Sequence, residues 1–426
     1  MQHNRKAAMS RRFHPAWLVA LAAFIALMGA AAFRAAPGPL MIPLNDEFGW
    51  PIGVMSTAVS LNILLYGLTA PFAAALIGRF GIRRVTSFAL VMIAAGSGVT
   101  VFVTAEWVLF LTWGVLIGIG TGSMALVFAS EIAGRWFVKR RGLVVGILSA
   151  GSATGQLVFL PLVASLAETT GWRAASIVIA GTALAVVPLV LVFIRNDPSE
   201  LGVGPYGVDA ADYVPPPRRT GAMKLAITTL VDASKTKTFW ALAAAFAICG
   251  ATTNGLVGLH FVPSAHDHGM SITAAAGLLA VVGVFDIIGT VMSGWLTDRV
   301  NPRYLLVGYY FFRGVGLAFL PTLLSQDISP SIVIFVVVYG LDWVATVPPT
   351  VALCREYFGD RANIVFGWVF ASHQVGAAIA ATVAGFSRDL LGTYTYAWLG
   401  GAALCVVAAY LSWIVKRPTQ SSVFAS

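Results

Sequence analysis

The chain has 426 residues, of which 58% are hydrophobic and only 11% are charged. Water-soluble domains carry about 25% charged residues, so a chain of this length lacks the polar surface that a soluble fold requires. The composition excludes a secreted enzyme, a nucleic-acid-binding domain and a disordered protein. It predicts an integral protein of the lipid bilayer, and the net charge of +9 must be explained within that setting.

Long apolar blocks predict twelve transmembrane helices. The first block, 16–42, contains a single charge, Arg34, and is too long for the apolar core of a signal peptide, so we interpret it as an uncleaved first helix. The other eleven are expected at 52–77, 85–104, 107–130, 142–167, 173–194, 238–262, 273–296, 304–324, 330–353, 362–386 and 395–415. The fold class is therefore an all-α membrane protein.

The longest interruption of the apolar pattern lies at 195–237, between the sixth and seventh predicted helices. Five prolines stand there among scattered charges, which is typical of a linker and not of a folded domain. The chain is thus divided into an N-terminal six-helix bundle at 1–194, a cytoplasmic linker, and a C-terminal six-helix bundle at 238–426.

Lys and Arg are distributed unequally between alternate loops. The two termini, the linker and every second loop contain 23 of the 27 basic residues, whereas the opposite loops contain only Arg173 and Arg388. Basic loops stay in the cytoplasm, so both termini and the linker are expected there, in a bacterial inner (plasma) membrane. This distribution accounts for the positive charge without a nucleic-acid partner.

The two halves repeat their basic residues at an offset of 220 positions. The first-half residues Arg79, Arg83, Arg135 and Arg141 correspond to Arg299, Arg303, Arg355 and Arg361. A general preference for basic cytoplasmic loops predicts the charge of these residues but not a shared offset. Duplicated halves are typical of transporters whose binding site lies between them near the middle of the bilayer.

The loop after the second helix of each half carries a known motif, G-x-x-x-D-R/K-x-G-x-R/K-R/K. The second copy keeps Gly294, Asp298 and Arg299, whereas the first copy lacks both the leading glycine, replaced by Ala74, and the aspartate, replaced by Gly78. With these motifs the chain resembles the major facilitator superfamily over essentially its whole length. The resemblance implies two pseudo-symmetric bundles with alternating access, and a role in conformational gating for five loop residues: Arg79, Arg83, Asp298, Arg299 and Arg303.

Within that superfamily the chain resembles the monocarboxylate and oxalate–formate transporter branch. The supporting stretches are R-W-F-V-K-R-R-G-L at 135–143 and P-G-P at 37–39. Animal monocarboxylate members carry an arginine four residues after an aspartate of helix 8, but here Asp286 is followed at that place by Thr290. The resemblance implies a small organic anion as the substrate, moved together with a proton.

Arg34 is the strongest candidate for a substrate-binding residue. A charged side chain within a membrane costs several kcal/mol unless it is paired or hydrated, so such residues mark functional sites. A guanidinium in a cavity shielded from water binds a carboxylate through two parallel hydrogen bonds. The P-G-P sequence at 37–39 should also loosen the helix beside it. Alternatively, Arg34 extends to the headgroups or pairs with a carboxylate of the protein.

Asp286 and Asp342, in the predicted helices 8 and 10, are candidates for proton coupling. A buried carboxyl group close to an arginine can gain and lose a proton as its surroundings change. The alternative is a fixed ion pair, for which Arg313 in helix 9 is the expected partner of Asp286.

Further polar residues of the predicted helices are candidates for hydrogen bonds to an oxygen-rich ligand: Tyr66, Asn254, His373 and Gln374, with Gln156 as a weaker one. Hydrogen bonds between helices are the alternative. His260, His266 and His268 have no companion carboxylates or cysteines at a fixed spacing, so no metal site is predicted. No cofactor and no obligatory protein partner is implied.

The sequence therefore predicts a secondary transporter of a small, monocarboxylate-like organic anion, coupled to protons. It contains no G-x-x-x-x-G-K-[ST] loop for ATP and no H-E-x-x-H cluster, which argues against ATP-driven transport and against an enzyme. The alternative is a proton-driven exporter of drugs or other amphiphiles, which the missing arginine of helix 8 favours.

Overall fold

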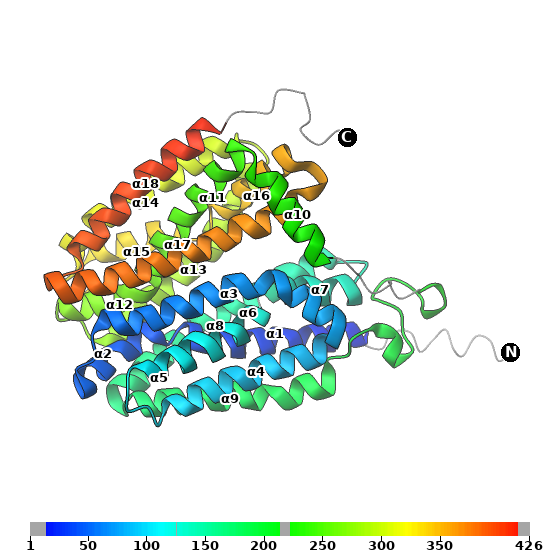
Figure 1. Cartoon of the computed structure of the whole chain (residues 1–426), viewed down its shortest axis with the longest axis horizontal. Coiled ribbons are helices and arrows are strands. Elements are labelled where there is room, and N and C mark those ends of the chain that lie inside the picture. The colour runs from blue at the N-terminus through cyan, green and yellow to red at the C-terminus, as the bar shows by residue number, and fades with distance from the viewer. Residues whose placement is uncertain (1–13, 125, 214–221, 416–426) are drawn as a thin grey trace.

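The computed structural model describes residues 14–124, 126–213 and 222–415. These residues form twelve membrane-crossing helices in two pseudo-symmetric bundles of six, and Figure 1 shows the N-terminal bundle lying beside the C-terminal one. Ten stretches of the described chain are long and apolar enough to cross a bilayer, as expected for an integral, multi-pass membrane protein. The chain enters and leaves the bundles at the same end, here called the terminal end, and the opposite end is called the far end.

The six helices of the N-terminal bundle include two that are interrupted. Helix 1 consists of α1 (Pro15–Arg34) and α2 (Pro37–Phe48), and helix 4 consists of α5 (Trp107–Leu109), the π-helical segment η2 (Phe110–Ile117), α6 (Gly118–Ser123) and α7 (Leu126–Trp136). The continuous ones are helix 2, or α3 (Ile52–Phe80); helix 3, or α4 (Ile82–Thr100); helix 5, or α8 (Arg141–Thr169); and helix 6, or α9 (Trp172–Phe193). The break of helix 1 falls at Ala35 and Ala36, directly before the P-G-P sequence, because proline begins a helix more readily than it continues one.

The C-terminal bundle also contains two interrupted helices. Helix 7 consists of α11 (Lys237–Gly250), the π-helical segment η5 (Ala251–Val257) and α12 (Gly258–Asp267), and helix 10 consists of α15 (Pro330–Asp342) and α16 (Val347–Phe358). The others are helix 8, or α13 (Ile272–Thr297); helix 9, or α14 (Pro302–Leu323); helix 11, or α17 (Ala362–Leu391); and helix 12, or α18 (Thr395–Ile414). The short η6 (Gly359–Arg361) precedes α17. A turn at 343–346 separates the two parts of helix 10.

Polar residues fix several helix starts in the C-terminal bundle. The side chains of Thr236, Ser271 and Ser329 accept hydrogen bonds from backbone N–H groups at the beginnings of α11, α13 and α15. These N–H groups have no partner within their own helix, so each cap stabilises the start of a crossing helix. At the opposite end of α17, Gly392 adopts a φ of 68°, a conformation that ends the helix and that glycine tolerates best.

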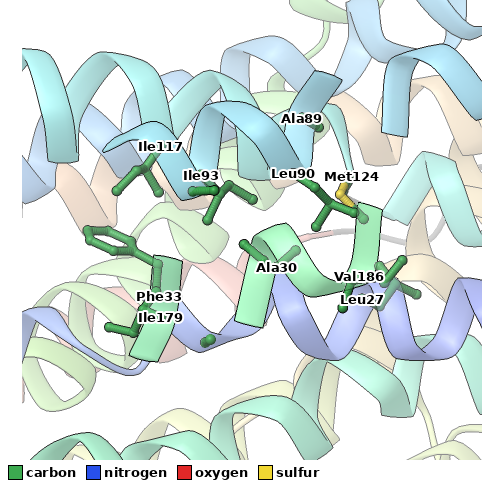
Figure 2. Packing of buried hydrophobic residues seen from close by; sticks show 14 of the residues in the cluster. Leu27, Ala30, Phe33, Ala89, Leu90, Ile93, Ile117, Met124, Ile179 and Val186 are labelled. Atoms are coloured by element: carbon green, nitrogen blue, oxygen red, sulfur yellow. The ribbon is translucent and has the colours of Figure 1, made fainter. Parts of the chain in front are cut away.

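Buried aliphatic residues from four helices hold the N-terminal bundle together. Figure 2 shows Leu27 and Ala30 of α1 packed between Ile93 of α4 and Val186 of α9, with Ile117 of η2 nearby. All five side chains are buried. The core is therefore continuous through helices 1, 3, 4 and 6, and it holds α1, which ends at Arg34, within the N-terminal bundle.

The two bundles meet along helix pairs that the internal repeat relates to each other. α3 packs against α17, and α8 packs against α13, so that helices 2 and 5 of one half contact helices 11 and 8 of the other. A third contact joins α2 to α12. Because the same helix types form both sides, the interface has the pseudo-two-fold symmetry expected from the duplicated sequence.

Residues 195–237 contain more regular structure than a proline-rich linker predicts. Beside two short 3₁₀ turns, η3 (Pro198–Leu201) and η4 (Ala210–Asp212), they include the helix α10 (Ala222–Ser234). The carboxylate of Asp232 on α10 pairs with Arg361 at 2.9 Å, and the indole of Trp368 donates to the carbonyl of Ala226. Hydrogen bonds from Lys235 and Arg361 also hold the pKa of Asp232 below its usual value. α10 is thus anchored on the C-terminal bundle.

Close packing in the C-terminal bundle depends on glycine at position 376 of α17. A methyl group there would overlap the main-chain carbonyl of Ala247 on α11. We expect Gly376→Ala to reduce the free energy of unfolding by about 1–3 kcal/mol, the usual cost of overpacking. Gly367→Ala on the same helix is the control, because its methyl group meets no atom within 4 Å and should change stability by less than about 1 kcal/mol. Thermal unfolding of the detergent-solubilised variants measures both; equal losses would contradict the packing argument.

Candidate functional site

A cavity of about 80 Å³ lies between the two bundles and is lined by residues of both. Its polar lining comes from α1, α3 and α8 on one side and from η5 and α17 on the other: Arg34, Asn62, Tyr66, Gln156, Asn254 and Gln374. Phe33, Trp343 and several aliphatic residues complete the wall. A mainly apolar wall with a few convergent polar groups is typical of a small-molecule binding site.

Arg34 is the last residue of α1 and stands beside the break of helix 1. Its Nη1 donates a hydrogen bond to the Tyr66 hydroxyl at 3.2 Å, and its guanidinium lies over the Tyr66 ring, 4.6 Å from the ring centre. Among the residues that the structure describes, no Asp or Glu lines this cavity and no ion pair reaches Arg34. A cation fixed in this way leaves donors free for an anion from outside the protein.

Gln374 and Asn254 bring amide groups from the C-terminal half to the same cavity. Gln374 is only 2% exposed, and its Nε2 atom has no hydrogen-bond partner in the structure. A buried amide without a partner costs free energy, so it marks a place where a ligand or a water molecule would bind. Asn254 belongs to η5, and π-helical segments are frequent at functional sites.

His373 is not among the residues that line the cavity, so its role in binding stays a prediction. Its ring packs against Phe246, with 4.9 Å between ring centres, and is stacked on Phe370 at 5.8 Å. Neighbouring residues of an α-helix point about 100° apart, so Gln374 can face the cavity while His373 faces α11. The structure therefore places His373 in the packing of the C-terminal bundle.

Asn62 and Trp343 also line the cavity, although the sequence analysis does not single them out as binding residues. Asn62 lies one helical turn from Tyr66 on α3, and its amide donates to the carbonyl of Trp113 at 2.6 Å. As a polar residue within an apolar helix, it could have been found by the rule that selected Asn254. Trp343 gives no such signal, because its position depends on the break of helix 10.

Arg313 forms its ion pair with Asp342 and not with Asp286. Nε of Arg313 donates to Oδ2 of Asp342 at 2.5 Å, and its Nη2 donates to the Asp342 carbonyl at 2.8 Å. Both side chains are buried, and Nη1 contacts Cys249 Sγ at 3.0 Å. The ion pair considered for Asp286 is thus found at Asp342, because α15, which ends at Asp342, packs against α14 more extensively than α13 does.

Asp286 instead holds the interrupted helix 10 in place. Its Oδ1 accepts hydrogen bonds from the Thr290 hydroxyl and from the backbone N–H of Val344, both at 3.0 Å. Val344 follows the cavity residue Trp343 directly. Neither Asp286 nor Asp342 lines the cavity itself, so each is connected to it through the turn that carries Trp343.

The five predicted gating residues all lie at the terminal end. Arg303 donates to the carbonyl of Val415 at 2.7 Å, Arg299 to that of Trp295 at 3.0 Å, and the backbone N–H of Arg83 to Asn196. Arg79 and Asp298 are exposed. Within the described part of the chain, none of these contacts joins one bundle to the other, so the gating role stays a prediction.

The comparison with known proteins decides the family. The model of the Major Facilitator Superfamily matches residues 19–381. The chain belongs to the major facilitator superfamily. Solved structures with the same fold include the inward-open xylose transporter XylE of E. coli, with a TM-score of 0.72 and 15% identity over 96% of this chain and 98% of that one. A D-xylose–proton symporter also has a TM-score of 0.72, at 16% identity over 94% of this chain and 97% of the other.

Relatives in sequence cover almost the whole chain. The chain is 25% identical to the uncharacterized MFS-type transporter YcxA of Bacillus subtilis over 414 residues, which are 94% of each protein. It is 26% identical to monocarboxylate transporter 13 of Bos taurus, over 93% of this chain and 86% of the relative. Human monocarboxylate transporter 12 is 29% identical over 70% of this chain and 60% of its own length. The chain is therefore a transporter and not an enzyme, and it resembles the monocarboxylate branch.

The buried pair of Arg313 and Asp342 should be important for stability. Asp342→Asn leaves a buried guanidinium without its counter-charge, so we expect the free energy of unfolding to fall by about 3–5 kcal/mol. Asp267→Asn is the control, because its pair with Arg388 is partly exposed and contributes about 1 kcal/mol or less. Thermal unfolding compares the two, and similar losses would show that burial does not distinguish the pairs.

Proposed function

We propose that this protein carries a small, monocarboxylate-like organic anion across the membrane together with a proton, by alternating access. The supporting observation is Arg34, a cation that has no acidic partner in the described structure and lines the cavity between the two halves. A charge at such a position is stabilised by water or by a ligand of opposite charge. A carboxylate meets that requirement best, because it accepts two parallel hydrogen bonds from a guanidinium.

The remaining polar groups fit the same ligand. The unpartnered Nε2 of Gln374 offers a second donor from the other half of the protein, and Asn254 and Tyr66 add groups that can bond a hydroxyl or carbonyl substituent. An anion held by Arg34 and Gln374 together bridges the two bundles. Such bridging makes closure of the cavity depend on the substrate, as alternating access requires.

The size of the cavity favours a small solute over a drug. Sites for drug-sized ligands enclose about 300–1,000 Å³, several times the volume found here. The relatives named monocarboxylate transporters support the same choice. Both observations favour an organic anion over the amphiphiles of a drug exporter.

Asp286 is proposed as the proton carrier, with Asp342 as the second candidate. Asp342 is engaged by Arg313 through both its carboxylate and its main chain, which opposes a change of protonation. Asp286 has no such cation bound to it: its hydrogen bonds come from the Thr290 hydroxyl and the backbone N–H of Val344. Protonation of Asp286 would weaken its hold on Val344, and the turn bearing Trp343 would carry that change to the cavity.

The positive charges of the loops support one orientation. We propose that the terminal end, which carries residues 195–237 and the predicted gating residues, faces the cytoplasm of a bacterial cell. The far end then faces the outside. In this orientation Arg79, Arg83, Asp298, Arg299 and Arg303 would act on opening and closing of the cytoplasmic side.

Uptake of labelled lactate or oxalate into proteoliposomes tests the role of Arg34. Arg34→Ala removes the counter-charge, so we expect the KM to rise roughly 10- to 100-fold, as for lost hydrogen bonds to a charged group. Arg34→Lys should keep part of the affinity, because it retains the charge but not the paired donors. Arg173→Ala, which removes an exposed arginine at the far end, is the control. Unchanged uptake by Arg34→Ala would remove Arg34 from the site.

The pH dependence of uptake tests the role of Asp286. Asp286→Asn keeps a group that accepts a hydrogen bond from Val344 but cannot bind a proton, so uptake driven by a proton gradient should be lost while exchange of substrate across the membrane persists. Asp342→Asn is measured in parallel. A pH dependence that survives in both variants would rule out both carboxylates as the proton carrier.

A further inference from the structure

Two carboxylates at the far end reach from one bundle to a helix start of the other. Asp389, near the end of α17, accepts the backbone N–H of Ile52 at 3.1 Å and that of Gly53 at 2.6 Å, at the beginning of α3. Glu168, near the end of α8, accepts the backbone N–H of Thr273 at 3.1 Å and its hydroxyl at 2.6 Å, at the beginning of α13. Each bundle thus provides one carboxylate and receives the other.

The two arrangements are related by the internal repeat. Glu168 and Asp389 are separated by about 220 residues, and so are Gly53 and Thr273. This is the offset that relates the basic loops of the two halves. The carboxylates stand at the ends of helices 5 and 11, and their partners begin helices 8 and 2, which are the helix pairs that join the bundles. At both pairs of repeat-related positions, a carboxylate of one half therefore caps a helix start of the other half.

The chemistry of these contacts makes them dependent on the position of the bundles. The first N–H groups of a helix have no partner within it and carry the positive end of the helix dipole, so a carboxylate is a favourable cap. Hydrogen bonds to an ionised acceptor are also stronger than neutral ones. Here the cap belongs to the other half of the protein, so separation of the halves at this end breaks both caps.

The surrounding contacts show that the bundles are closed against each other beside Asp389. Gly385 of α17 lies against Gly53 and Ser56 of α3 with no space for a side chain. One turn further, Ser60 donates to the carbonyl of Ala378 at 2.7 Å. These contacts lie between the far end and the cavity, so the α3–α17 edge of this entrance is shut.

Two ion pairs at the far end also involve carboxylates, but each stays within one bundle. Glu47 pairs with Arg173 within the N-terminal bundle, and Asp267 pairs with Arg388 within the C-terminal bundle. They place carboxylates at the same end of the protein, but they do not cross the interface. They therefore provide matched controls.

We propose that Glu168 and Asp389 are positioning residues of the transport cycle, which hold the far entrance shut by capping helix starts of the opposite half. Opening toward that side requires both caps to break, and closure restores them. The two caps act as a symmetric pair, so that loss of one weakens one edge of the closed interface and loss of both releases it. Only the naming of this entrance as external rests on the proposed orientation.

A cysteine reporter tests the proposal. Ser56→Cys places a thiol at a fully buried position of the closed interface, and the three native cysteines are buried as well. A membrane-impermeant maleimide, added in the absence of any substrate, labels the reporter only when the far entrance opens. We expect Glu168→Gln with Asp389→Asn to raise the labelling rate by about tenfold, which corresponds to roughly 1.4 kcal/mol. Each single variant should give a smaller increase, and Glu47→Gln with Asp267→Asn should give none.

Amide hydrogen exchange distinguishes the loss of one cap from a general loss of stability, because it reports on individual backbone N–H groups. Asp389→Asn should speed exchange at Ile52 and Gly53 but not at Thr273, and Glu168→Gln should do the reverse. Labelling and exchange that match the control variants would overturn the proposal. Because no substrate is used, this outcome is independent of whether Arg34 binds an organic anion.

Discussion

The architecture of the site depends on one unneutralised cation inside the membrane. Arg34 stands where helix 1 breaks, over the ring of Tyr66, and the described structure provides no carboxylate to pair with it. A guanidinium in this setting is tolerable only if water or a ligand reaches it, so the two bundles must leave space around it and must open to admit what fills that space. The cavity, the polar residues of both halves and the need for alternating access all follow from this requirement.

A second buried arginine, Arg313, is neutralised within the protein. Arg313 is surrounded by Asp342, two main-chain carbonyls and a sulfur atom, so its donors are used within the protein. A guanidinium bound in this way supports structure, because removing Asp342 would leave a buried charge without compensation. Arginine thus serves packing inside the C-terminal bundle and is available for binding in the cavity, and the difference lies in the acidic partner.

Interruptions of the helices also follow the internal repeat. The break at Ala35 and Ala36 in helix 1 corresponds to the π-helical segment η5 of helix 7, and the end of α6 at Ser123 corresponds to the turn at 343–346 in helix 10. Where a helix is interrupted, backbone groups are released from helical hydrogen bonds. They can then contact a ligand near the middle of the membrane. Here three of these features bring Arg34, Asn254 and Trp343 to one cavity, so local irregularity of the backbone and the position of the site have a common origin.

The sequence by itself determined the membrane environment, the twelve crossings, the duplication and the exceptional character of Arg34, because hydropathy and charge act residue by residue along the chain. Only the tertiary structure decided which side chains meet. Adjacent helix residues point about 100° apart, so His373 packs against Phe246 while Gln374 faces the cavity. For the same reason the sequence pairs Arg313 with the wrong aspartate, Asp286: the orientation and packing of α14 and α15 place Asp342 against Arg313 instead.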